Sequence, residues 1–541
     1  MAIWADVTDW LAGLRHIRAP SGVTRVQTRL VEAGEGLFEP VAREAGAWRL
    51  FPRAMFDAVL AEAARAGGPK DAEWQSLVEA AHAAARAAPP VDFAAGDWLL
   101  GIGAMWWQPG HAARILELKR LSGVAYANFV HDVLPLTVPE HCGGDLVRAF
   151  TQHFTTVCLL ADHVVCNSDA SRADFIRWQR KLLPELAIPT SVLRLDAAAA
   201  RAASGGERGD FVLAVGSVES RKNQLGLLRA WLQLIRRHGE AAVPSLVIVG
   251  LHGHLADQVV ALREAAPELR RRVEFRHSVP DSELDALYAG CLFTVFNSHA
   301  EGWGLPVSES LAHGRVPLVT DLPVLREAGG DHAIYVQPEN VPALADAAWA
   351  LISHPAGLRA REAALRAAPP APGWRALAER CAGFLNAPTA RALDRAPLPA
   401  GAVVPCGLPA MPDLPALPPA HVTSGALLRH GDGWSHQEEW GCWAVSPGEI
   451  SLRLPLAPAW RCAAVRVTLE VMAPPGGHVI HAMGRAHVLA GETTLHLDAP
   501  WPQGDVLEIA FQVGAGVAVP PDHRMLGFGL RALSVSPRPT P

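Results

Sequence analysis

The sequence predicts two doubly wound α/β domains followed by an antiparallel β-sandwich. Three observations carry this prediction. Short, continuously apolar runs alternate with helical patterns up to about residue 353, and such runs are typical of parallel strands covered on both faces. Nine prolines fall within residues 388–419, and proline disfavours the interiors of helices and sheets. Beyond that stretch apolar residues recur with a period of two, as in the strands of a sandwich.

The first domain is expected over residues 1–203. Its predicted strands are at 97–103 (DWLLGIG), 124–130 (VAYANFV), 163–168 (HVVCNS) and 191–195 (SVLRL). An alanine-rich segment, residues 54–88, predicts a helical excursion. The glycine-containing stretch ARAASGGERG, residues 200–209, predicts a linker to the next domain.

The second domain is expected over residues 204–372. Its predicted strands are at 211–217 (FVLAVGS), 245–250 (SLVIVG), 273–279 (VEFRHSV), 292–298 (LFTVFNS), 316–320 (VPLVT) and 333–338 (AIYVQP). Helical patterns separate them, one of which ends at Gly239. Strands alternating with helices in this way indicate a parallel sheet. A crossover helix is expected next, over residues 373–387.

The proline-rich stretch predicts a semi-rigid linker over residues 388–420, and the sandwich is expected over 421–541. Its alternating strands include EISLRLPL, AAVRVTLEVM, TTLHLDA and VLEIAFQV. Trp434, Trp440 and Trp443 cluster before the first clear strand. They could stack on sugar rings as in a carbohydrate-binding module, or they could be core residues, which is the favoured alternative.

Composition narrows the function classes. A net charge of −6 gives no reason to expect a nucleic-acid partner. The eight cysteines form no CxxC pair, so neither a zinc ribbon nor a disulfide framework is indicated, and a reducing compartment fits better.

Asp6 and Asp9 interrupt the N-terminus where a signal peptide needs an apolar run. No apolar stretch approaches the roughly 20 residues of a membrane helix, so we expect a cytoplasmic protein with at most peripheral membrane contact.

Residues 299–314 (HAEGWGLPVSESLAHG) follow the strand predicted at 292–298. Pro306 suits the first position of a helix, and Gly314 suits its end. Residues 299–305 should therefore form a loop at the carboxyl end of a parallel strand, where ligands of open α/β sheets bind.

Two glycines and two glutamates give this loop its chemistry. Gly302 and Gly304 let the backbone approach a ligand closely, and the N-terminus of the following helix favours a phosphate. Glu309, expected in the first helical turn, can accept hydrogen bonds from a diol such as ribose. Glu301, on the other side of the phosphate, can hold a second polyol. The alternative is a capped helix with two solvated glutamates.

Other charged residues follow predicted strands. Arg221 and Lys222 lie in the loop after the strand at 211–217, and two cations there suit a diphosphate. The alternative is a solvated basic loop. His131 ends a predicted strand of the first domain next to Asp132, which could orient its ring, or it is an ordinary satisfied polar residue.

Residues 301–320 (EGWGLPVSESLAHGRVPLVT) resemble the signature of retaining glycosyltransferases of family 4. The resemblance extends over roughly residues 1–387. It includes the segments VGSVESRKNQLGLLRAW, VPDSELDALYAGC, PVLREAGGDHAIYVQPENVPALADAAWALI, NFVHDVLPLTVPE and VVCNSDASRADF. It implies the GT-B fold, in which two Rossmann-like domains face each other across a cleft, with the acceptor-side domain first and the nucleotide-sugar domain second.

The resemblance also implies roles for single residues. Lys222 matches the family lysine on the donor phosphates. Arg221 resembles the variant in which an arginine precedes that lysine, because Ser217 stands where many members carry an arginine. His131 matches the histidine that faces the donor sugar. Gly22, in APSGVTRVQTRL, resembles the N-terminal glycine loop near the phosphates, although only one glycine is present where two are common.

The resulting site prediction has two groups. The catalytic group is Glu301, His131 and Lys222, and the donor-binding group is Arg221, Lys222, Gly302, Gly304, Leu305, Glu309 and Gly22. No D-x-D triplet occurs in the chain, so we expect no metal ion and no cofactor; cations and a helix N-terminus can neutralise a diphosphate instead.

The resemblance implies a retaining hexosyltransferase of bacterial surface polysaccharide synthesis, such as that of lipopolysaccharide. The donor is a nucleoside-diphosphate sugar, with GDP-mannose the first expectation, and the enzyme is a mannosyl- or rhamnosyltransferase. The acceptor is a glycan or a polyprenyl-linked oligosaccharide at the inner face of the cytoplasmic membrane. Two alternatives stay open: a GT-B phosphorylase or epimerase, and a non-catalytic glycan-binding protein with a degenerate site.

Overall fold

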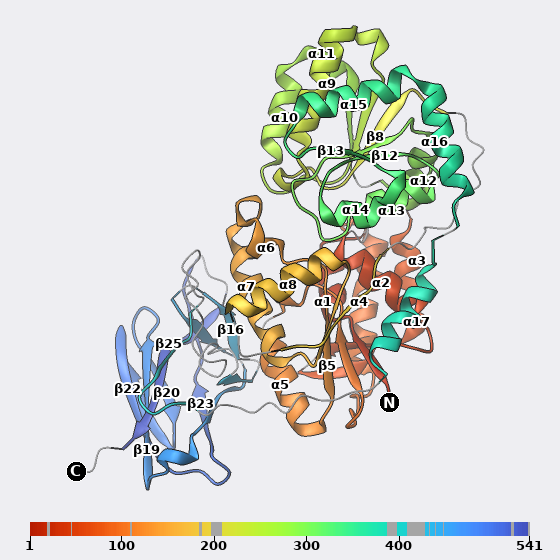
Figure 1. The fold of residues 1–541 in the computed structure, drawn as a ribbon. Coiled ribbons are helices and arrows are strands. Elements are labelled where there is room, and N and C mark those ends of the chain that lie inside the picture. The colour runs from red at the N-terminus through yellow and green to blue at the C-terminus, as the bar shows by residue number, and fades with distance from the viewer. Residues whose placement is uncertain are drawn as a thin grey trace.

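The computed structural model describes residues 1–18, 22–44, 46–65, 67–108, 111–182, 187–195, 208–277, 279–369, 371–386, 398–407, 428–431, 433–438, 440–446, 448–520 and 524–538. In these residues the chain forms two α/β domains and a body of two antiparallel sheets (Figure 1). The predicted fold class is confirmed.

The N-terminal domain is built on a seven-stranded sheet with the order β3-β2-β1-β4-β5-β6-β7. Its strands are β1 (Ile3–Asp6), β2 (Glu39–Glu44), β3 (Ala47–Leu50), β4 (Trp98–Gly101), β5 (Ala125–Val130), β6 (His163–Cys166) and β7 (Thr190–Val192). Neighbouring strands are parallel except for β2 and β3, which form an antiparallel pair at one edge.

Helices cover both faces of this sheet. Trp98 and Leu100 of β4 point into one apolar core, whereas Leu99 between them points into another, as the alternation of side chains along a strand requires. The first core is closed by α1 (Thr8–Gly13), α2 (Val23–Ala33), α3 (Arg53–Ala63) and α4 (Ala72–Ala87). The second is closed by α5 (His111–Ser122), α7 (Gly144–Leu160) and α8 (Asp169–Leu182).

The second domain has a six-stranded, wholly parallel sheet with the order β10-β9-β8-β11-β12-β13. Its strands are β8 (Phe211–Val215), β9 (Ser245–Val249), β10 (Val273–Arg276), β11 (Thr294–Phe296), β12 (Pro317–Thr320) and β13 (Ile334–Val336). The boundary predicted between residues 203 and 204 lies outside the described residues.

Helices also cover both faces of the second sheet. One face packs against α9 (Gln224–His238), α10 (Ala256–Ala265), α11 (Pro267–Arg272) and α15 (Val341–Ser353), and the other against α12 (Asp281–Gly290). Helices α13 (Leu305–Ala312) and α14 (Pro323–Gly329) lie next to the N-terminal domain (Figure 1). Their residues Val307 and Leu325 join the apolar core of that domain.

The chain then returns to the N-terminal domain. After α16 (Pro355–Ala367), helix α17 (Trp374–Phe384) packs on α2, where Leu377 and Cys381 are buried in the core of the N-terminal domain. Arg375 donates to the carbonyl oxygens of Ala33 and Glu35 at 3.1 and 2.7 Å. The segment expected to be a crossover helix is thus a helix that ties the second domain to the first.

The C-terminal body is a β-sandwich. One sheet has the order β16-β17-β25-β19-β22, with β14 and β24 also paired to β25, and the other has the order β15-β18-β23-β20-β21. The strands are β14 (Val403–Pro405), β15 (Arg429–His430), β16 (Trp434–Gln437), β17 (Cys442–Val445), β18 (Ile450–Pro455), β19 (Ala464–Met472), β20 (His478–Ala482), β21 (Arg485–Leu489), β22 (Glu492–Pro500), β23 (Val506–Val513), β24 (Val517–Ala518) and β25 (Met525–Pro537). Val467 and Leu469 of β19 and Ile509 of β23 lie in the core between the sheets.

Part of the predicted linker belongs to this sandwich. Most of residues 388–420 lies outside the described residues. Residues 398–407 are described, and their strand β14 pairs antiparallel with β25, while Leu398, Val404 and Cys406 are buried in the sandwich core. For this stretch the linker prediction is wrong, because a strand with a single neighbour tolerates proline.

The tryptophans of the sandwich are mainly packing residues. Trp434 and Trp443 are only 5% and 8% exposed, so their ring faces are not open to a sugar. Trp434 packs edge-on against Phe528. Trp440, which is half-buried, packs edge-on against Trp443 and donates from Nε1 to Glu438 at 2.8 Å. The core alternative is confirmed for Trp434 and Trp443.

Two further features concern membrane and thiol chemistry. Among the residues that the structure describes, no helix is both long enough and apolar enough to cross a bilayer. The eight cysteines all lie in the described residues and form no disulfide there, and six of them are buried. Burial raises the pKa of the Cys381 thiol to about 12, so it packs as a small apolar group.

A chain that ends at residue 386 should fold without the sandwich. The sandwich core shares no residue with the cores of the α/β domains, and α17 is retained. Differential scanning calorimetry should show that the shortened chain keeps one cooperative transition of the full-length protein and loses the other. Aggregation of the shortened chain, without a cooperative transition, would mean that the sandwich completes the α/β pair.

Candidate functional site

Glu301 lies in the loop between β11 and α13, and Glu309 lies within α13 itself. Gly304 caps α13 with φ +96°, a conformation that glycine adopts without strain, and a Cβ there would lie 2.7 Å from Leu325. Helix α13 begins at Leu305, so Pro306 is its second residue and Glu309 its fifth. The prediction that Glu309 lies in the first turn is wrong, because the glycine cap lets the helix begin before the proline.

Glu301, in the same loop, contacts two cations. Its Oε1 lies 2.6 Å from Lys222 Nζ and 2.9 Å from a guanidinium nitrogen of Arg221, and its side chain is 7% exposed. Arg221 and Lys222 belong to a short 3₁₀ turn, Ser220–Lys222, that follows β8. Because β8 and β11 are neighbours in the sheet, their carboxyl ends bring the three charges together.

The charges of this cluster depend on one another. Burial by itself would raise the pKa of Glu301, but Arg221 and Lys222 outweigh burial and hold that pKa below its ordinary value. Burial would lower the pKa of Arg221, but Glu301 and Glu219 raise it above the ordinary value. Glu301 and Arg221 are therefore both ionised at neutral pH, and each charge stabilises the other in this buried place.

Hydrogen bonds with the backbone and with one carboxylate hold Arg221 in place. Its guanidinium donates to the carbonyl oxygen of Ala300 at 2.9 Å and to Glu219 Oε1 at 2.7 Å. Its own carbonyl oxygen accepts from the amide of His299 at 2.8 Å. Asn223, with φ +54°, ends the turn and begins α9. The cationic turn is thus fixed against the glutamate loop.

His131 faces this cluster from the N-terminal domain. It follows β5, and its Nε2 lies 2.7 Å from the carbonyl oxygen of Ile102, so this nitrogen carries the proton and donates. Asp132, the expected partner of the ring, instead accepts from the amide of Leu134 at 3.0 Å. Burial lowers the pKa of His131 to about 4, so the imidazole is neutral at physiological pH.

The two domains touch at Gly302. Its carbonyl oxygen accepts from the hydroxyls of Ser168 and Ser171 at 2.9 and 3.1 Å. A Cβ at Gly302 would lie 2.1 Å from the carbonyl oxygen of His131, so only glycine allows this approach. The glutamate loop therefore lies directly against the strand end that carries His131.

A second contact between the domains stabilises this arrangement. Glu327 of α14 accepts from the amides of Asp169 and Ala170, both at 2.8 Å. These amides begin α8, where a carboxylate is favoured by the helix dipole. A side chain of the second domain thus caps a helix of the first.

A cavity of about 210 Å³ opens between the domains beside His131. Asp132, Glu219 and Arg221 contribute its polar side. Its apolar wall comes from the N-terminal domain, including α6 (Leu134–Thr137) and α7, and is lined by Trp106, Phe129, Leu134, Leu146 and Phe150. The cavity and the Glu301 cluster share Arg221, so they are parts of one site.

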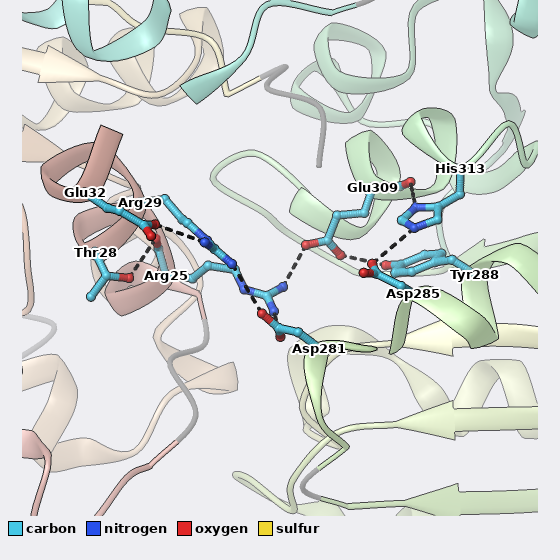
Figure 2. A network of polar contacts seen from close by, with 9 residues as sticks. All are labelled: Arg25, Thr28, Arg29, Glu32, Asp281, Asp285, Tyr288, Glu309 and His313. Carbon is cyan, nitrogen blue, oxygen red and sulfur yellow. Dashed lines mark hydrogen bonds and ion pairs between the residues drawn. The ribbon is translucent and has the colours of Figure 1, made fainter. Parts of the chain in front are cut away.

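Glu309 lies in a separate polar network that also crosses between the domains (Figure 2). Its Oε1 lies 2.8 Å from Arg25 of α2, and its Oε2 accepts from the hydroxyl of Tyr288 at 2.8 Å. Arg25 also contacts Asp281 at 2.6 Å, and Arg29 contacts the same carboxylate at 3.3 Å. Glu309 is therefore held by an arginine of the opposite domain.

Gly22 caps the helix that carries Arg25. It has φ +54° and no heavy atom within 4 Å of a Cβ built on it, so its conformation, not crowding, favours glycine. Residues 19–21 before it lie outside the described residues. Val23, the next residue, lines the cavity, which places the Gly22 turn at its edge.

The structure brings together most of the predicted residues. Glu301, Lys222, Arg221 and Gly302 contact one another or His131 directly, and Gly304 and Leu305 form the start of α13 behind them. Sequence reasoning missed the partners that come from distant segments, which are Arg25, Asp281, Tyr288, Ser168, Ser171 and Glu327. The position of Arg25, three residues after Gly22, was the one available signal.

In the described part of the chain no three His, Cys, Asp or Glu side chains gather as a metal site would require.

The region that holds the charged cluster matches a known protein family. Residues 209–354 match the model of the family described as "Glycosyl transferases group 1". This region contains Lys222, Arg221, Glu301 and Glu309, and it ends before α16. His131 and Arg25 lie outside it.

The sequence relatives are bacterial sugar transferases. The chain is 27% identical over 248 residues to the serotype-specific mannosyltransferase WbdA of Escherichia coli, a match that covers 41% of this chain and 29% of WbdA. It is 28% identical over 226 residues to the O-antigen chain mannosyltransferase B of Escherichia coli, covering 40% and 58%. The chain thus spans less than a third of WbdA and a little over half of the second relative. Among solved structures, sucrose-phosphate synthase (tll1590) from Thermosynechococcus elongatus is 16% identical, with a TM-score of 0.48 over 71% of this chain and 98% of that one.

A Glu301→Gln variant should lose about 3 kcal/mol of the free energy of unfolding at pH 7. Lys222 would be left buried without its ion-pair partner, and Arg221 would keep only Glu219. The folded-state pKa of Glu301 lies below its ordinary value of 4.5. Its ionised form therefore stabilises the fold above about pH 4.5, and this contribution is lost as the pH falls through the folded-state pKa. Urea unfolding at a series of pH values should show the gap between wild type and variant narrowing below about pH 4.5.

Glu79→Gln is the matched control, because it removes an equal charge from a surface pair. Glu79 lies 3.1 Å from Arg15, and the two side chains are 58% and 45% exposed. Its loss should change stability by less than about 1 kcal/mol. A Glu301→Gln variant as stable as wild type at pH 7 would contradict the proposed dependence of the two cations on Glu301.

Proposed function

We propose that the protein is a retaining glycosyltransferase that moves a hexose from a nucleoside-diphosphate sugar to a glycan acceptor in bacterial surface polysaccharide synthesis. The observation that carries the proposal is the buried Glu301–Lys222–Arg221 cluster, which lies at the strand ends of the matched region and faces His131. The names of the relatives, both mannosyltransferases, favour GDP-mannose as the donor.

The donor would lie against the second domain. Lys222 and Arg221 supply positive charge for the diphosphate, and hydrogen bonds to charged groups are worth roughly 1.5–3 kcal/mol each. The backbone at Gly304 and Leu305 adds the positive end of α13. Glu309 accepts hydrogen bonds from the ribose diol, and Glu301 from hydroxyls of the sugar. The Gly22 turn lies opposite, on the edge of the cavity.

The reaction separates charge, and the cluster is suited to stabilise that separation. As the glycosidic bond to the diphosphate breaks, negative charge builds on the leaving group and positive charge on the sugar ring. Fixed cations aimed at the diphosphate stabilise the transition state more than the ground state. The acceptor attacks from the face that the diphosphate leaves, and the diphosphate takes the acceptor proton. No side chain is then needed as a nucleophile.

His131 would position the donor sugar. With a pKa of about 4 the ring is neutral at physiological pH, so it contributes a hydrogen bond to a sugar hydroxyl and not a proton. Its Nε2 is committed to Ile102, which leaves Nδ1 for that contact. His131 therefore acts on orientation, which favours reaction by holding the sugar in a productive geometry.

The acceptor would enter through the cavity beside His131. Its apolar wall suits the apolar face of a sugar ring, and its polar side, with Asp132 and Arg221, suits hydroxyl groups. We propose a glycan or polyprenyl-linked oligosaccharide as acceptor, used at the inner face of the cytoplasmic membrane through peripheral contact.

Lys222 and Arg221 take the place of a divalent metal on the diphosphate, since the chain has no D-x-D triplet.

Glu309→Ala should weaken donor binding, whereas Glu301→Ala should mainly lower turnover. Loss of hydrogen bonds from ribose to a carboxylate should cost roughly tenfold or more in affinity. Loss of Glu301 leaves Lys222 and Arg221 free for the diphosphate but removes a group on the reacting sugar. Binding is measured by calorimetry with GDP-mannose, UDP-glucose and dTDP-rhamnose, and turnover by GDP release in the presence of mannose oligosaccharides and a chelator.

Two outcomes would count against the proposal. If none of the three nucleotide sugars binds the wild-type protein, the second domain is not a donor site of this kind. If both variants lose affinity equally and keep wild-type turnover, the two carboxylates do not have the separate roles assigned to them. Glu283→Ala, a half-exposed glutamate of the neighbouring helix α12, serves as the control and should leave both quantities unchanged.

A further inference from the structure

Arg25 makes a contact that the proposed donor site does not explain. The side chain projects from α2 of the N-terminal domain to α12 and α13 of the second domain (Figure 2). One guanidinium nitrogen lies 2.8 Å from Glu309 Oε1 and another 2.6 Å from Asp281 Oδ1. The guanidinium therefore bridges two carboxylates of the opposite domain, one of which is the proposed ribose ligand.

Arg25 covers the open side of Glu309. The other carboxylate oxygen of Glu309 accepts from Tyr288, which is 1% exposed and lies beneath it. Glu309 itself is 15% exposed. Because Tyr288 occupies the buried side of the carboxylate, a ribose diol must approach from the side on which Arg25 lies.

Helix α2 is firmly attached to its own domain. Arg53 donates to the carbonyl oxygens of Val31 and Glu32 at 2.9 and 2.5 Å, and Arg375 of α17 donates to Ala33. These bonds hold the C-terminal end of α2. Arg25 therefore cannot leave Glu309 by a shift of the helix alone, and either its side chain swings away or the two domains separate.

We propose that Arg25 is a built-in competitor of the nucleotide, which occupies the ribose subsite in the ligand-free protein and must release Glu309 when the donor binds. This inference rests on the proposed function, in which Glu309 holds ribose. Asp281 gives the guanidinium a partner that it keeps after release. The apparent affinity for nucleotide is then lower than the subsite alone would give, because only the released fraction binds.

The test compares Arg25→Met with Arg29→Met by calorimetry, with GDP and UDP as probes. Arg29 lies on the same helix and contacts Asp281 and Glu32 but not Glu309, so its loss removes an equal charge without freeing the subsite. Arg25→Met should bind the preferred nucleotide roughly three- to tenfold more tightly than wild type, the range expected for loss of a partly exposed ion pair. Arg29→Met should bind as wild type does.

A double variant shows whether the gain comes from Glu309. In a Glu309→Ala background the competitor has no subsite to block, so adding Arg25→Met should leave nucleotide affinity unchanged. Weaker nucleotide binding by Arg25→Met would make Arg25 a ligand of the nucleotide and overturn the proposal. Unchanged binding by Arg25→Met would overturn it too, as would an equal gain in affinity in the presence and absence of Glu309. If neither GDP nor UDP binds any of these proteins, the proposed function fails and this inference fails with it. Binding by wild type without a gain in Arg25→Met overturns the inference alone.

Discussion

The carboxylate of Glu301 is the contact on which the site depends. It is 7% exposed and lies within 3 Å of two cations, and without it Lys222 would be buried without its ion-pair partner. The two cations come from the end of β8 and the carboxylate from the end of β11, so the parallel order of the sheet is what brings them together. In the proposed reaction a diphosphate adds a further anionic partner for Lys222 and Arg221. The cluster is already assembled, so these two side chains can bind the diphosphate without rearrangement.

The contacts between the domains place this cluster opposite His131. Gly302 approaches so closely that a side chain would collide with the His131 carbonyl, and Glu327 caps α8 from the other domain. Arg25 adds a third contact through Glu309. The first two contacts leave the carboxylate of Glu309 free, whereas the third engages it. This difference is why Arg25, and not Glu327, is expected to compete with a nucleotide.

The sequence was sufficient for features set by local pattern. Continuous apolar runs predicted the strands of the second domain and four strands of the first, and period-two runs predicted several strands of the sandwich, but β1, β2 and β3 were missed. Strand-end positions singled out Glu301, Lys222, Arg221 and His131. Features set by distant packing were not predictable in this way. Arg25 meets Glu309 across 284 positions of sequence, and β14 becomes a strand only because β25 is there to pair with it. The start of α13 was predicted one residue too late. It depends on the conformation of Gly304, which the sequence pattern alone does not specify.

The central claim is that Lys222 and its neighbours recognise a diphosphate. Calorimetry of GDP and GMP with the wild-type protein and a Lys222→Met variant tests it most directly, because the two nucleotides differ only in the β-phosphate. Wild type should bind GDP roughly tenfold or more tightly than GMP, and Lys222→Met should bring the two affinities close together. Equal affinity of the wild-type protein for GDP and GMP, or a preference for GDP that survives the loss of Lys222, would contradict the account.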